Sequence, residues 1–218
     1  MTGIGRVSLL PAREQVAAIL RQAILLRQFE SGYELTLKEA ADMVGSSITP
    51  VREAFQILFG EGLIELRPNK GAVVLGVNEK SIHDHYELRA VLESYAASEA
   101  SRPGKDLSSL EETQKISERA IQSGDTTLYQ DCNQTFHLSI WKAAGNEQLE
   151  RTLSSLWNGF SLGLGITEKD YALRSFSEHE EIYAAICAHD SETAKTLMHR
   201  HILRSMQDVL TRYQNDSK

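Results

Sequence analysis

The stretch Thr49-Pro50-Val51-Arg52-Glu53-Ala54 opens a predicted helix that decides the fold of the first part of the chain. Pro50 falls in the first turn, where a missing amide hydrogen costs nothing, and apolar residues follow at helical spacing. Upstream, Thr36 and Glu39 have the spacing of a capping box, which opens a short helix that ends at Gly45. Two short helices joined by a tight turn indicate a helix-turn-helix.

The pattern extends in both directions from this pair of helices. Residues 11–29 carry apolar side chains at helical spacing and predict a preceding helix. After residue 60 the spacing changes to two, and the turn sequence Pro68-Asn69-Lys70-Gly71 divides the apolar residues into two short strands. This order of elements is typical of a winged helix-turn-helix, which we assign to residues 8–76.

The rest of the chain predicts an all-α domain over residues 79–214. Strand patterns do not recur, and helical spacing runs over 79–102, 106–123, 126–144, 147–163, 173–189 and 191–214. Residues 76–78 form the short joint between the two domains. The predicted fold class is therefore mainly α, with a winged helix-turn-helix of three helices plus a β-hairpin wing followed by an all-α helical bundle.

The composition is that of a globular chain. Of 218 residues 41% are hydrophobic and 24% charged, which excludes a collagen, a coiled-coil rod and a disordered tail. No apolar run approaches the roughly 18 residues of a membrane span, and the N-terminus has no signal-peptide core, so we expect a cytoplasmic protein without a membrane partner. The two cysteines, Cys132 and Cys187, are too few for a disulfide framework.

Charge and histidine content differ between the two parts of the chain. The net charge of −7 argues against nonspecific polyanion binding by the whole chain, but the first 75 residues hold eight basic and eight acidic residues. The remainder carries the whole deficit and all seven histidines. We therefore expect the two domains to have different chemistries.

In a helix-turn-helix the N-terminal residues of the second helix reach base edges in the major groove. Arg52 can bond a guanine edge bidentately or a phosphate, and Ser47 and Thr49 precede it on the same helix end. Lys38 on the preceding helix and Lys70 at the wing tip are candidate contacts to the DNA backbone. The alternative is that Arg52 pairs with a nearby glutamate and the lysines are only solvated surface.

Three histidines lie on the apolar faces of three different predicted helices. They are His137, which shares its face with Asn133, and His179 and His201. Three imidazoles and one oxygen ligand can hold a borderline divalent ion such as zinc, nickel or iron, and helical bundles build metal sites in this way. The alternative is that each histidine is a hydrogen-bonded core residue.

Residues 12–75 carry the motifs of a known family. Residues 49–54 together with Leu58, Glu61-Gly62-Leu63-Ile64 and Lys70-Gly71-Ala72-Val73-Val74 closely resemble the GntR family of bacterial transcription regulators. The resemblance implies DNA contacts by Lys38, Thr49 and Arg52, and it places Gly71 in a wing that approaches the minor groove. The family usually has arginine where this chain has Ile48; an aliphatic side chain can contact a thymine methyl, so we hypothesise a more A/T-rich operator.

Residues 82–210 resemble the FCD domain of FadR-type GntR regulators. The resemblance lies in Glu87-Leu88-Arg89, Leu92-Glu93, Phe136-His137, Ala143-Ala144-Gly145-Asn146, His179, Ile182, Ala185-Ile186 and His201-Ile202. Many members bind a metal through three histidines and an Asp or Asn four residues before the first of them. The resemblance thus implies a metal site of Asn133, His137, His179 and His201.

Asn133 leaves this site one charge more positive than the more common aspartate would. An anionic effector that coordinates the metal can supply the missing charge. Arg89, on the inner face of the domain's first helix, is then a candidate clamp for the effector's carboxylate. The alternative for Arg89 is an ion pair within the domain, with a glutamate such as Glu93.

Together these features predict a sequence-specific DNA-binding transcription regulator, a repressor rather than an enzyme. Its operator affinity would be controlled by a small organic acid bound at the metal-containing site. One module reads only a short stretch, so we expect a homodimer on a pseudo-palindromic double-stranded DNA operator, and the resemblance implies that the helical domains dimerise.

Two rival functions remain open from the sequence. A metal-dependent hydrolase would use the three-histidine site to activate water, although the pattern places no general base there beyond Glu178 and Glu180, which flank His179. A ligand-independent regulator would use the histidines only for packing.

Overall fold

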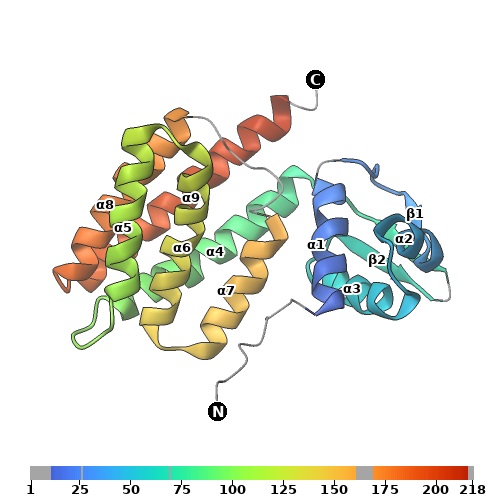
Figure 1. Cartoon of the computed structure of the whole chain (residues 1–218), viewed down its shortest axis with the longest axis horizontal. Helices are drawn as coiled ribbons and strands as arrows, with labels where there is room; N and C mark the ends of the chain where they lie inside the picture. The colour runs from blue at the N-terminus through green and yellow to red at the C-terminus, as the bar shows by residue number, and fades with distance from the viewer. Residues whose placement is uncertain (1–10, 26, 69, 161–168, 216–218) are drawn as a thin grey trace, which may run out of the picture. The chain divides into compact units, whose positions relative to one another are not determined.

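The computed structural model describes residues 11–25, 27–68, 70–160 and 169–215, with the backbone alone at 158–160. The chain divides into two compact units, Met1–Val77 and Asn78–Lys218 (Figure 1). In the described residues, the first unit combines three helices with a small sheet and the second is helical throughout. This confirms the predicted mainly α fold class. Residues 8–10 of the expected first domain lie outside the described residues.

The helix-turn-helix consists of α2 (Leu37–Val44) and α3 (Ile48–Gly60). Thr36 caps α2 as predicted: its hydroxyl accepts a hydrogen bond from the Glu39 amide at 3.1 Å, and Glu39 completes the capping box. Gly45 ends α2 in the left-handed conformation, with φ 63°. Ser47 stands at the N-cap of α3 without a capping hydrogen bond from its side chain, so its exposed hydroxyl is not used to start the helix.

The helix α1 (Ala12–Leu25) packs against α3 and is shorter than the sequence predicts. Arg27, at φ 55°, lies in the left-handed region and ends the helix, although Phe29 beyond it is buried. Arg21 of α1 makes a two-pronged ion pair with Glu61 at the end of α3, through hydrogen bonds of 2.8 and 2.5 Å. The apolar side of α3 completes this core with Val51, Ala54, Phe55 and Leu58.

The wing is a three-stranded sheet rather than a simple hairpin. The strands β2 (Ile64–Arg67) and β3 (Gly71–Val74) pair antiparallel, with Arg67 opposite Gly71. The two-residue strand β1 (Glu34–Leu35) joins the other side of β3, which gives the order β1-β3-β2. The strand β1 was not predicted from the sequence, because two residues are too few to show an alternating pattern.

The second unit is a helical bundle. Its helices are α4 (Glu79–Ala100), α5 (Ser108–Ser123), α6 (Thr126–Ala144), α7 (Glu147–Phe160), α8 (Lys169–Cys187) and α9 (Ser191–Asn215). Left-handed Gly124 and Gly145 end α5 and α6 where the sequence predicts. The predicted extension of α7 to residue 163 lies outside the described residues, and α8 begins four residues earlier than expected.

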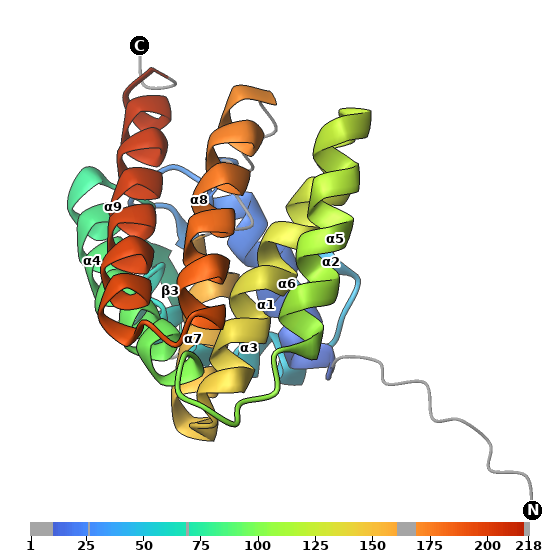
Figure 2. The same cartoon turned by 90° about the vertical axis from the view of Figure 1, so that its left-hand side faces the viewer.

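The helices α4 and α9 pack along each other, while α6 lies against α4 and α5, and α8 against α9 (Figure 2). Phe136, Ile140 and Trp141 of α6 are fully buried at the centre of this arrangement. Each such side chain contributes about 1.5–3 kcal/mol through the removal of apolar surface from water. Within the described residues, every helix is too short or too polar to cross a membrane.

Candidate functional site

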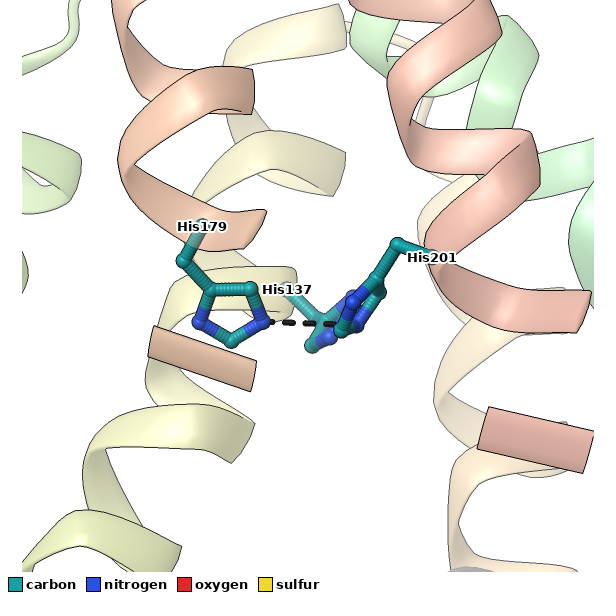
Figure 3. Close-up of side chains that lie close together, drawn as sticks. All are labelled: His137, His179 and His201. Carbon is teal, nitrogen blue, oxygen red and sulfur yellow. Dashed lines mark hydrogen bonds between the residues drawn. The ribbon is translucent and has the colours of Figure 1, made fainter. Parts of the chain in front are cut away.

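Three buried imidazoles meet inside the bundle. His137 comes from α6, His179 from α8 and His201 from α9, and each side chain is at most 2% exposed (Figure 3). One nitrogen of each lies within 4.8 Å of the others. The Nε2 atoms of His179 and His201 are 3.3 Å apart, and the ring of Phe136 stacks on His179 at 3.9 Å between centroids.

A buried carboxylate orients the first of these imidazoles. His137 donates its Nδ1 hydrogen to Oε2 of Glu93 at 2.5 Å, because an ionised carboxylate can only accept. Glu93, on α4, also accepts hydrogen bonds from Arg89 at 2.8 Å and from the Trp141 indole at 3.3 Å. With Nδ1 occupied in this way, Nε2 is the atom of His137 left to bind an ion.

A second carboxylate orients His201 in the same manner. Its Nδ1 donates to Oε2 of Glu178 at 2.6 Å, and Arg204 bonds the same glutamate through Nε and Nη2. The Nε2 atom of His201 is therefore an acceptor, so the 3.3 Å hydrogen bond to it is donated by Nε2 of His179. The Nδ1 atom of His179 is buried and has no hydrogen-bond partner among the described residues.

The electrostatics keep His179 and His201 neutral and the two carboxylates charged. Burial lowers the pKa of His179 well below its usual value, and the neighbouring His201 and His137 lower it further. Burial also lowers the pKa of His201, to about 4, although Glu178 partly opposes the shift. Burial raises the pKa of Glu93, but Arg89 and His137 outweigh it and bring the pKa to about 2. Burial also raises the pKa of Glu178, but the hydrogen bonds from His201 and Arg204 outweigh it and bring the pKa to about 2.

This donor set fits a divalent metal ion. Neutral imidazole is the form that binds metals, and two nitrogens bound to one tetrahedral zinc ion lie about 3.3 Å apart. The separation of His179 Nε2 from His201 Nε2 is 3.3 Å. Metal-binding histidines usually donate their other nitrogen to a carboxylate or carbonyl, as His137 and His201 do here.

The other two predicted site residues of this domain are Asn133 and Arg89. Asn133 is half-buried one turn before His137 on α6, and its role as an oxygen ligand stays a prediction. Arg89 is 4% exposed and forms an ion pair with Glu93 at 2.7 Å. The structure therefore contains the ion pair that the sequence left as the alternative for Arg89. A direct contact between Arg89 and an effector stays a prediction.

The carboxylate partners of the histidines were not predictable from the sequence. Spacing alone does not indicate that Glu93 and Glu178 accept hydrogen bonds from His137 and His201. Helical spacing would have placed Glu93 on the inner face of α4 with Arg89. His85 is also buried on that face, and burial, followed by the charge of Arg89, lowers its pKa to about 3.

The predicted DNA-reading residues are available on the surface of the first unit. Ser47, Thr49 and Arg52 are exposed in the N-cap and first turns of α3, and Lys38 is exposed on α2. Arg52 makes no ion pair with any residue that the structure describes, so the alternative of a glutamate partner finds no support there. Lys70 is exposed in the turn of the wing, one residue before β3 begins.

Comparison with known families agrees with both halves of this arrangement. The model of the bacterial regulatory proteins of the gntR family matches residues 12–74, and the FCD domain model matches residues 84–204. The chain is thus a DNA-binding transcription regulator of the GntR family with an FCD domain, a combination that fits the FadR-type subfamily. Because this family consists of regulators, the hydrolase alternative is set aside.

Individual relatives share most of the chain. The protein named "Probable D-xylose utilization operon transcriptional repressor" of Paenarthrobacter nicotinovorans is 29% identical over 87% of both chains. The gluconate operon transcriptional repressor of Bacillus subtilis is 33% identical over 66% of this chain and 58% of its own length. The solved structure of Escherichia coli McbR/YncC has the same fold, with a TM-score of 0.69 at 22% identity, covering 94% of this chain and 100% of that one.

Proposed function

We propose that the chain is a repressor whose operator affinity is controlled by a small carboxylate metabolite bound at a metal-containing site in the helical domain. The observation that carries the proposal is the meeting of three buried imidazoles, two of them oriented by carboxylates. Two relatives are named as repressors, one of them for the gluconate operon, and gluconate is an acid of the proposed class.

His137, His179 and His201 would hold the ion through their Nε2 atoms, which for His179 requires its proton to move from Nε2 to Nδ1, and Asn133 is the proposed oxygen ligand. Three imidazoles suit zinc, nickel or iron. When bound, the ion supplies positive charge to which a carboxylate can coordinate. The negative charges of Glu93 and Glu178 are already balanced by the ion-paired arginines, so the surrounding residues do not neutralise a divalent ion. An anionic effector would do so.

In the first domain, we propose that Arg52, Thr49 and Ser47 read the operator in the major groove while Lys38 and Lys70 contact phosphates. Gly71 lets the wing approach the minor groove. The five polar and charged side chains are all exposed on the helix-turn-helix and its wing, which supports this assignment. Ile48, which is 45% exposed beside them, supports a preference for thymine methyl groups in the half-site.

One winged domain covers too few base pairs for specific binding at physiological salt, so the active form would be a homodimer on a pseudo-palindrome. The effector would act by binding the DNA-competent and DNA-incompetent arrangements of that dimer with different affinities. The size of the response is then set by this difference in affinity.

The proposal is tested by His179→Ala, with His199→Ala as the matched control, because His199 is exposed on α9 whereas His179 is buried in the cluster. Metal content and operator affinity are measured on full-length protein after loading with zinc, alone and with a panel of sugar acids. His179→Ala should lose the metal and the response to acid but keep operator binding. A wild-type protein without stoichiometric metal, or a His179→Ala protein that keeps it, would contradict the proposal.

A further inference from the structure

Two hydrogen-bonded rows of side chains end on the histidine cluster, and each consists of an arginine, a glutamate and an imidazole in that order. Arg89, Glu93 and His137 form the first, and Arg204, Glu178 and His201 form the second. In each, an arginine bonds a glutamate that accepts the Nδ1 hydrogen of one imidazole. The first row runs from α4 to α6, and the second lies on α8 and α9.

Both guanidinium groups are held in place on more than one side. Arg89 lies over the rings of Trp157, at 4.7 Å from its centroid, and of Tyr86 at 5.2 Å. Arg204 lies over Tyr171 at 5.1 Å and bonds Asp208 at 2.8 Å as well as Glu178. Aromatic faces and a second carboxylate fix the planes of these groups and hence the glutamates that they bond.

We propose that Arg89–Glu93 and Arg204–Glu178 are positioning pairs for the metal site. Each pair keeps the proton of one ligand histidine on Nδ1 and turns its Nε2 lone pair toward the ion. This inference rests on the metal site of the proposed function and assigns Arg89 an indirect role there. The reason is mechanical: an imidazole whose Nδ1 bonds a fixed carboxylate can neither flip nor exchange tautomers at low cost.

The two pairs differ in burial, and this decides how to test them. Arg89 and Glu93 are 4% and 0% exposed, so removing one charge would strand the other in the interior. Arg204 and Glu178 are 16% and 18% exposed and tolerate a single change better. Glu178→Gln is therefore the first variant. Glu181→Gln is its matched control, because Glu181 lies on the same helix and pairs with Arg200 at 2.7 Å on the exposed surface.

The measurement is zinc affinity of the full-length, chelator-stripped protein by competition with a chromophoric chelator, together with the visible spectrum of the Co²⁺ form. Glu178→Gln should bind zinc about 10–100-fold more weakly and show an altered Co²⁺ spectrum, while Glu181→Gln matches the wild type. Wild-type affinity and spectrum in Glu178→Gln would overturn the inference. So would a lower melting temperature of the stripped protein with unchanged zinc affinity, because that is the result of a purely structural pair.

The buried pair is tested by the double variant Arg89→Gln/Glu93→Gln, which removes both charges together. If it folds by circular dichroism, its zinc affinity should fall over the same range, while the affinity for acid at saturating zinc stays within about twofold of the wild type. A loss of acid affinity at saturating zinc would overturn the indirect role of Arg89. If this variant does not fold, Glu178→Gln decides the inference alone. A wild-type protein that binds no zinc would instead overturn the proposed metal site itself.

Discussion

Among single residues, Gly71 belongs to the family motif, but the packing of the wing also requires a glycine at this position. The family resemblance places Gly71 near DNA, but the structure supplies a reason within the wing. Its φ of 115° lies in the left-handed region, and a Cβ there would meet the Leu35 carbonyl oxygen at 2.3 Å and the Thr36 Cα at 2.8 Å. The close approach of β1 to β3 therefore requires a residue without a side chain.

Gly71→Ala should accordingly destabilise the winged domain by roughly 2–3 kcal/mol, because both the clash and the backbone strain must be relieved. The free energy of unfolding in urea measures this. Gly60→Ala is the control, since a Cβ at Gly60 meets nothing within 4 Å and its backbone is helical. Equal stability of Gly71→Ala and the wild type would contradict the requirement for glycine at this position.

Arg52 is expected to act on DNA rather than on folding. It is exposed on α3 and makes no ion pair within the described residues, so Arg52→Ala should leave the thermal melting curve unchanged. Operator affinity should fall by about 1–3 kcal/mol, with loss of discrimination at one base pair. Fluorescence anisotropy on specific and scrambled DNA measures both. Arg200→Ala, an equal change of charge in the other domain, should bind like the wild type, and unaltered specific binding by Arg52→Ala would refute its role.

The residue scale also shows where inference from sequence stops. Helical spacing placed His137, His179 and His201 on inner faces, and all three are buried. The spacing does not predict that Glu178, which is adjacent to His179 in the chain, accepts a hydrogen bond from His201. Such a contact depends on how α8 and α9 pack, and their periodicity does not contain this information.

At the scale of elements, the helix ends were predictable because local chemistry fixes them. The capping box at Thr36 and the left-handed glycines 45, 124 and 145 act within one turn of the chain. The strand β1 was not predictable, because it exists only through pairing with β3, nearly forty residues later in the chain. The early end of α1 at Leu25 was also hidden, because apolar residues continue to Phe29.

The helix α4 makes the stability of the second domain sensitive to acid. Burial, and then Arg89, lower the pKa of His85 to about 3, against about 6.5 in an unfolded chain. Below about pH 6.5 His85 binds a proton in the unfolded chain but stays neutral in the folded chain. The free energy of unfolding therefore falls as the pH falls toward 3. Above pH 6.5 this residue adds no slope. Its contribution is at most about 1.4 kcal/mol per pH unit.

Urea unfolding of the chelator-stripped protein at several pH values between about 4 and 7.5 measures this slope. His85→Gln should flatten it, whereas His199→Gln, at an exposed position, should not. His201, with a pKa of about 4, leaves a residual slope of the same sign in both variants. Identical slopes in His85→Gln and the wild type would contradict the burial of a neutral imidazole on α4.

For the whole molecule, the net negative charge and the histidines lie in the second unit, and the two units differ in function as they differ in composition. The family assigns DNA binding to the first unit, and the histidine cluster lies entirely in the second. The sequence alone supports this organisation because each unit has its own period, turns and motifs. The effector is less predictable, because the side chains that select it follow no fixed spacing.

Sequence-specific DNA binding is tested by selection of genomic fragments of the source organism with the purified full-length protein, washed at graded salt, with Arg52→Ala in parallel. We predict enrichment of one short pseudo-palindrome by the wild type, released steeply as salt rises, and weaker enrichment by Arg52→Ala with relaxed selection at one base pair. A wild-type protein that enriches no sequence, even after loading with zinc and candidate acids, would contradict this prediction.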